Sequence, residues 1–128
     1  MNSKLDVTAW GPVVASGVPN SILQKPLQDG MFEIHFGEKT LYMKISNSQF
    51  LDSHPSVLVC LNAAIRDRQN KTPPYFSGEG VSNSTNSCLI SFSDPSTHID
   101  KINLGWYIGN ENWLSFQSDL AQFLDSFA

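Results

Sequence analysis

The sequence predicts an α+β fold, a two-layer sandwich in which helices pack on an antiparallel sheet. Residues 29–45, DGMFEIHFGEKTLYMKI, alternate apolar and polar side chains on both sides of a turn containing Gly37. Such alternation is typical of a half-buried hairpin. Residues 110–127 instead repeat apolar side chains at helical spacing. Hairpins joined through helices favour a mainly antiparallel sheet with helices on it.

Length and composition indicate one domain that spans residues 1–128. The chain has 128 residues, of which 41% are hydrophobic. This size is enough for one core, and the apolar content is ordinary for a folded domain.

The N-terminal part predicts a weak helix followed by the hairpin. Residues 5–14 space apolar side chains roughly as a helix does, but Gly11-Pro12 interrupts them, so we expect a short or broken helix ending by Gly17. In the hairpin, one face carries the apolar side chains of both strands: Phe32, Ile34, Phe36, Leu41, Met43 and Ile45.

The middle of the chain predicts a helix and then a long loop. Ser53 can cap a helix with Pro55 in its first turn, and apolar residues from Val57 to Ile65 recur three and four apart, so we expect a helix over 54–69. Residues 69–87 are rich in Pro, Gly, Ser and Asn and predict a loop, with a short strand at Tyr75-Phe76.

The C-terminal part predicts two strands and the strongest helix. CLISF, from Cys88, and KINLGWYIG, from Lys101, are strand-like. The helix has Asn110 as its cap, and one stripe holds its apolar residues: Trp113, Phe116, Leu120, Phe123, Leu124 and Phe127. The expected order is a weak helix, two strands with room for a third, a helix, two strands and a helix.

Charge argues against nucleic acid as a partner. The net charge is −4, and after residue 71 the chain has Lys101 as its only basic residue against six acids. Phosphate binding needs clustered Lys and Arg, so an acidic or neutral surface suits a polypeptide better. No signal peptide and no membrane insertion are expected, because no apolar run has the needed length. The protein is therefore expected in the cytoplasm.

No residue cluster predicts catalysis, a metal or a cofactor. His35, His54 and His98 lack metal-ligand spacing, and Cys60 and Cys88 are best interpreted as buried free thiols. The remaining enzyme hypothesis pairs Cys60 with a histidine, and it requires a reactive thiol.

Four segments resemble the class I chaperones of bacterial type III secretion, the Tir-chaperone-like family. WGPVVASGVP (10–19) is similar to the end of that family's first helix, and residues 27–45 resemble its acidic-Gly turn and hairpin. Residues 60–80 are similar to its helix ending in Leu-Asn and the loop that follows. Residues 102–128 resemble its last strand and C-terminal helix.

The resemblance implies a homodimer without catalytic activity that binds the unfolded N-terminal segment of a secreted effector protein. The effector would add strands to an open sheet edge and dock apolar side chains in surface patches. The residues expected in the effector-binding patch are Val13, Val14, Met31 and Tyr42. The residues expected at the dimer interface, in the helix at 54–69 and the strand at 87–92, are Val57, Leu58, Leu61, Ile65 and Leu89.

The charge leaves a second function open. An acidic immunity or inhibitor protein, which occludes the active site of a toxin, shares the size, the charge and the lack of catalytic residues. It would act through exposed acids such as Glu79, Asp94 and Asp100.

Overall fold

The computed structural model describes residues 13–22, 27–53, 55–61, 74–98 and 113–126. The elements follow in this order: β1 (Val13–Gly17), α1 (Pro19–Ile22), β2 (Gly30–Phe36), β3 (Lys39–Ser46), the 3₁₀ helix η2 (Ser48–Asp52), β4 (Val57–Leu61), α2 (Glu79–Thr85), β5 (Cys88–Ser93), the 3₁₀ helix η4 (Pro95–His98) and α3 (Phe116–Asp125).

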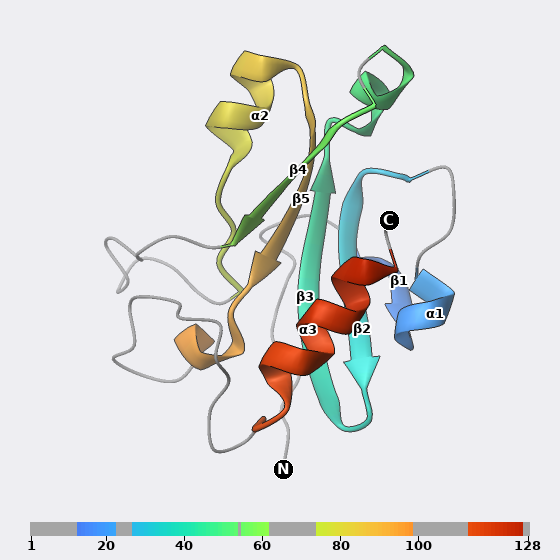
Figure 1. Cartoon of the computed structure of the whole chain (residues 1–128), viewed down its shortest axis with the longest axis vertical. Helices are drawn as coiled ribbons and strands as arrows, with labels where there is room; N and C mark the ends of the chain where they lie inside the picture. The colour runs from blue at the N-terminus through green and yellow to red at the C-terminus, as the bar shows by residue number, and fades with distance from the viewer. Residues whose placement is uncertain (1–12, 23–26, 54, 62–73, 99–112, 127–128) are drawn as a thin grey trace.

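The fold class is α+β, as the sequence predicts. The strands form one five-stranded sheet in the order β1-β2-β3-β5-β4 (Figure 1). The inner pairs, β2 with β3 and β3 with β5, are antiparallel. The two edge strands pair in the other sense: β1 runs parallel to β2, and β4 runs parallel to β5. Within the described ranges, each edge strand is therefore paired on one side only.

The hairpin of β2 and β3 has the predicted turn, and the structure gives its register. Phe32 lies opposite Met43, Ile34 opposite Leu41, and Phe36 opposite Lys39. The two-residue turn contains Gly37 with φ of 64°, a backbone conformation that glycine adopts without a steric penalty. Because opposite residues share a face, the apolar side chains of both strands form one continuous surface.

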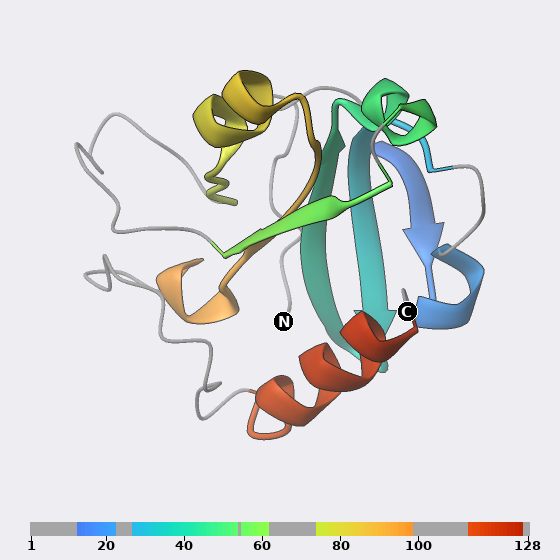
Figure 2. The ribbon, with the colours of Figure 1, turned by 45° about the horizontal axis from the view of Figure 1, so that its top comes forward.

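Helix α3 covers this apolar face and forms the main core with it. Phe116, Leu120 and Phe123 are the buried residues of the helix. Phe123 meets Phe92 of β5 and Phe36 of β2 in edge-on ring contacts, at centroid distances of 6.1 and 6.3 Å. In Figure 2 the helix runs along one side of the sheet, and α2 lies at a distance from it. The two-layer arrangement thus places the C-terminal helix on the hairpin.

The opposite face of the sheet carries a smaller apolar cluster. Met31 and Tyr42 are buried there, and Val13 and Phe76 pack against them. The same face holds the polar side chains of β3 that contact α2, namely Lys44 and Ser46. Both faces of the hairpin are therefore covered.

The weak helix expected to end by Gly17 is wrong in the described part of the chain. Residues Val13–Gly17 form strand β1, and the residues before Val13 lie outside the described ranges. Val13 and Val14 are β-branched and favour extended backbone. Pairing with β2 then stabilises a strand that a local helical spacing did not predict.

The helix expected over 54–69 is also wrong where it can be compared. Residues Val57–Leu61 form β4, residues 55–56 are not helical, and residues 54 and 62–69 lie outside the described ranges. Every residue from Val57 to Leu61 is apolar, so the pattern suits either element. Two of the five are β-branched valines, and the pairing of β4 with β5 determines that a strand forms.

The region expected to be a loop contains helix α2, while Tyr75 and Phe76 are not in a strand. The strand CLISF is confirmed as β5. The C-terminal helix is confirmed too, although it begins at Phe116, and the expected cap Asn110 lies outside the described residues. The strand expected from Lys101 lies outside them as well.

Replacement of Phe123 by alanine should destabilise the fold strongly. The ring is 2% exposed and packs between two aromatic side chains, so its removal leaves a cavity in the core. We expect the free energy of unfolding to fall by about 3 kcal/mol or more, measured by urea titration. Gln122→Ala on the exposed side of α3 is the control and should change it by less than about 0.5 kcal/mol. A small effect at Phe123 would contradict the core assignment.

Candidate functional site

Strand β4 is an open edge of the sheet. Among the described residues it pairs with β5 alone, with Val57 beside Cys88 and Leu61 beside Phe92. The other side of β4 therefore presents backbone N–H and C=O groups without a partner strand in the described chain. Such an edge is a template for pairing with another extended chain.

Side chains of β4 alternate between an open and a covered face. Val57, Val59 and Leu61 are 38%, 45% and 44% exposed. In register they lie on the face of Cys88, Ile90 and Phe92, which is the face that α3 covers elsewhere. We call these three exposed residues the β4 surface. It extends the apolar core face outward beyond the reach of the helix.

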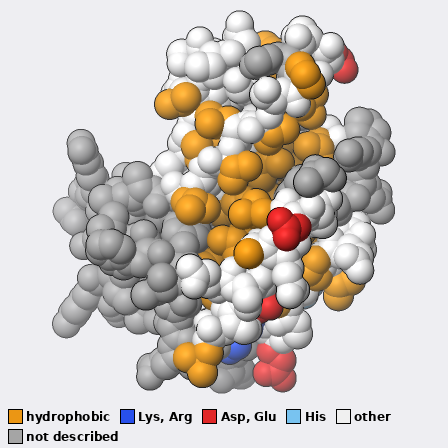
Figure 3. Space-filling model, viewed as in Figure 1, with side chains coloured by type: hydrophobic (Ala, Val, Ile, Leu, Met, Phe, Trp, Pro, Cys, Tyr) orange, Lys and Arg blue, Asp and Glu red, His pale blue; other side chains and the backbone are white. Residues whose placement is uncertain are grey.

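The space-filling view shows the same feature (Figure 3). Hydrophobic side chains gather in a band on the face where β4 and α3 lie in Figure 1. Natural edge strands usually carry a charged residue, most often Lys, or a proline, and either one prevents pairing with another strand. The sequence from Ser53 to Leu61 has no Lys, Arg, Asp or Glu, and its one proline, Pro55, precedes the strand. The β4 edge lacks these protective features.

Edge strand β1 is more protected than β4. Its Ser16 hydroxyl and the His35 ring share a hydrogen bond of 2.8 Å, and His35 also bonds the Thr40 hydroxyl at 3.1 Å. This chain of polar side chains crosses β1, β2 and β3. β1 also has one strongly exposed apolar side chain, Val14 at 45%, where β4 has three.

The covered face of β4 rests on the start of α2. Gly78 has φ of 104°, and a Cβ atom at this position would lie 2.5 Å from the Cys60 sulfur and 3.1 Å from Leu89. Glycine is therefore required both by the backbone and by the space. This contact fixes one face of β4 against α2, so that the β4 surface is presented on the other face.

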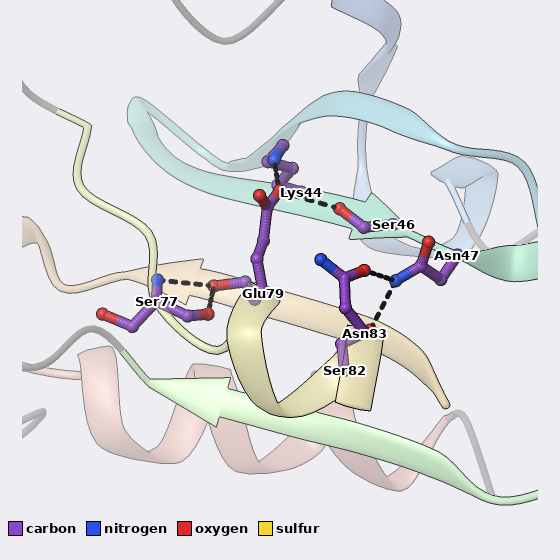
Figure 4. Close-up of polar contacts among 8 residues, drawn as sticks. Lys44, Ser46, Asn47, Ser77, Glu79, Ser82 and Asn83 are labelled. Carbon is purple, nitrogen blue, oxygen red and sulfur yellow. Dashed lines mark hydrogen bonds and ion pairs between the residues drawn. The ribbon is translucent and has the colours of Figure 1, made fainter. Parts of the chain in front are cut away.

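Polar contacts attach α2 to the sheet (Figure 4). Glu79 forms an ion pair with Lys44, and the Asn47 side-chain amide donates hydrogen bonds of 2.8 Å to the Ser82 hydroxyl and to the side-chain Oδ1 of Asn83. A cavity of about 210 Å³ lies beside these contacts, between Lys44, Phe76, Gly78 and Leu89. Because the charge of Lys44 is balanced by Glu79, the arrangement is suited to holding α2 and not to binding an anion.

The structure contradicts the patch expected from Met31 and Tyr42. Met31 is 0% and Tyr42 is 4% exposed, since Val13 and Phe76 pack against them. Val13 is half-buried in the same cluster, and Val14 alone of the four expected residues is strongly exposed. These four side chains therefore do not form one open surface.

The residues expected at the dimer interface have different surroundings. Val57 and Leu61 are exposed and Leu58 is half-buried, all three on a strand instead of a helix. Leu89 is wrong as an interface residue, because it is 0% exposed inside the chain. Ile65 lies outside the described residues. Val59 was missed, although its alternation with Val57 and Leu61 was a signal for it.

One serine–histidine pair was not expected from the sequence. The Ser93 hydroxyl lies 2.8 Å from His98 Nε2 and accepts a hydrogen bond of 2.9 Å from the Tyr75 backbone N–H. The distance would suit a nucleophile and its base. Ser93 is 0% exposed, however, so the pair connects β5 to the neighbouring loops. Among the described residues, no group of three metal-ligating side chains comes together.

Two of the acids expected in an inhibitor surface are engaged within the chain. Asp94 is 0% exposed, and Glu79 forms the ion pair with Lys44. Asp100 lies outside the described residues. Asp94 is therefore not accessible to a toxin. A basic residue of a toxin could bind Glu79 only by displacing Lys44.

Comparison with known proteins adds no family assignment. No family model, no curated protein and no solved structure matches the chain. The resemblance to secretion chaperones thus rests on the sequence segments quoted above. In the part of the chain that the structure describes, no helix is long and apolar enough to cross a bilayer.

Cys60 should react slowly with thiol reagents. Burial raises the pKa of its thiol above the ordinary value, so the thiolate, which is the reactive form, is scarcer at pH 8 than in a free cysteine. At a given pH, the native protein should be labelled more slowly than a small free thiol. Its labelling rate should also begin to rise at a higher pH than the rate for the free thiol. Cys60→Ser should remove most of the native labelling, because Cys88 is fully buried. Rapid labelling at neutral pH would instead support the enzyme hypothesis.

Proposed function

We propose that this chain is a non-catalytic protein-binding domain that takes up an extended apolar segment of a partner protein at β4. The observation that carries the proposal is the edge strand itself. It combines a backbone edge that has no partner strand among the described residues with three exposed apolar side chains on one face. A folded domain gains nothing for its own stability from leaving such a surface in water.

Strand addition explains why both features occur together. Main-chain hydrogen bonds between an edge strand and an added peptide supply affinity for any extended chain. Alternate side chains of the peptide then meet the apolar or the covered face of the sheet. The β4 surface selects segments that carry apolar residues at every second position on the side of α3.

The charge near the site favours an apolar partner segment. The nearest Asp, Glu, Lys or Arg residues in the sequence are Asp52 and Arg66, so none of these lies between Ser53 and Leu61. A partner with charges in the docked positions would lose their hydration and find no opposite charge on β4.

The chain's resemblance to secretion chaperones suggests one particular form of this function. In that form the partner is the unfolded N-terminal segment of a secreted effector, held soluble in the bacterial cytoplasm until export. An unfolded segment is available for strand addition, whereas a folded domain has already paired its backbone. The proposal moves the binding surface from Met31 and Tyr42 to β4.

A charge on the β4 surface should weaken the binding of unfolded polypeptide. Val59→Lys places an ammonium group at the centre of the surface, and a bound apolar segment would have to bury it. We expect the affinity for a reduced and carboxymethylated, permanently unfolded polypeptide to fall at least about tenfold, equivalent to about 1.4 kcal/mol. Fluorescence anisotropy of the labelled polypeptide measures this.

The matched control is Val81→Lys on α2, which makes the same change at a valine that is 54% exposed. It should leave the affinity unchanged. Equal losses for both variants would indicate a general effect of charge. Unchanged binding by Val59→Lys, with its fold verified by circular dichroism, would contradict the proposal.

A further inference from the structure

We infer that, when no partner segment is bound, a second copy of this chain occupies the β4 edge through antiparallel pairing about a two-fold axis at Val59. This inference concerns the same site as the proposed function but does not require that function to be correct. It follows from the symmetry of the edge and from the side chains of β4.

Symmetry restricts how two β4 strands can pair. Two copies of one edge related by a two-fold axis run antiparallel, and residues opposite each other then project to the same face. The axis must therefore lie midway between one residue and the same residue of the second copy. An axis at Val59 is the choice that pairs all five residues of β4, whose bounds are Val57 and Leu61.

The pairs that this register creates are apolar throughout. Val59 lies opposite Val59 of the second copy, and Val57 lies opposite Leu61. These side chains have exposures of 38% to 45% in the single chain, and they would form one row between the two α3 helices. On the other face Leu58 lies opposite Cys60. Cross-strand pairs of β-branched and aliphatic side chains stabilise such a sheet.

Charge does not oppose the pairing locally. Each copy carries a net charge of −4 with His counted as neutral, yet no Lys, Arg, Asp or Glu occurs between Ser53 and Leu61. Lysine or inward-pointing charge, the usual obstacle to edge pairing, is absent from this strand. The edge is thus compatible with a copy of itself as well as with a partner segment.

The dimer should be weak and should compete with the partner. A five-residue strand buries less than the about 800 Å² per partner that is typical of stable complexes. The sheet has one β4 edge in each chain, so a docked segment and a second copy exclude each other. Self-pairing would therefore protect the apolar edge at rest and release it when a partner segment is present. The homodimer expected from the sequence would thus form through the edge strand and not through a helix.

Disulfide trapping tests the register. In a Cys60→Ser background, Val59→Cys places two sulfurs at the axis, where opposite Cα atoms are about 4.5 to 5.5 Å apart, within the range that a disulfide spans. We expect the Val59→Cys protein to form a covalent dimer under mild oxidation, at more than about ten times the rate of Leu61→Cys in the same background. Two copies of residue 61 would lie about 13 Å apart along the strand.

The complementary mixture is the decisive control. Val57→Cys and Leu61→Cys proteins, each unable to trap itself, should form a mixed disulfide when combined, because these positions are opposite each other in the proposed register. The Cys60→Ser protein alone should stay unlinked, since Cys88 is buried. Equal trapping at positions 59 and 61, or none at 59 in protein with an unaltered circular dichroism spectrum, would overturn the inference.

Competition separates this inference from the proposed function. The permanently unfolded polypeptide should slow trapping of Val59→Cys in proportion to its occupancy. Trapping that the polypeptide leaves unchanged, with binding measured in the same sample, would overturn the shared edge. Trapping without any polypeptide binding would instead contradict the proposed function and leave the two-fold pairing supported.

Discussion

Strand β5 is the element on which the rest of the sheet depends. All six of its residues are buried, and it pairs with β3 on one side and β4 on the other. Its Ile90 and Phe92 belong to the core beneath α3, while the Ser91 and Ser93 hydroxyls accept hydrogen bonds from the backbone N–H groups of Ser77 and Tyr75. One strand thus joins the hairpin, the C-terminal helix and the loop that precedes α2. The position of β4 follows from it.

The parts of the fold predicted correctly from the sequence are those determined by local pattern. Strict alternation with a glycine turn predicts the hairpin, and a long apolar stripe predicts α3. Residues Val57–Leu61 have no polar residue to set a period, so their helical spacing and their strand spacing are equally good. Only β5, about 30 residues later in the chain, decides between them. Non-local pairing is the information that the local sequence does not contain.

The binding surface expected from the sequence is not an exposed one. The resemblance to secretion chaperones implied an open sheet edge with an apolar patch, whereas the residues chosen for that patch, Met31 and Tyr42, are buried. Alternation assigns a side chain to a face of the sheet, but it does not tell what covers that face. Phe76, which was expected in a short strand, packs over this cluster from outside any strand. An accessible surface therefore depends on contacts between segments far apart in sequence.

The two faces of β4 differ in the space that they leave for the side chains of an added strand. Gly78 approaches Cys60 so closely on one face that a Cβ atom would not fit, whereas Val57, Val59 and Leu61 are open on the other. A strand added to this edge would place every second side chain beside the crowded start of α2 and the others beside the apolar row. Small residues suit the first set and large apolar residues the second. The side-chain size of a bound segment should therefore alternate, and one residue of register shift would exchange the two sets.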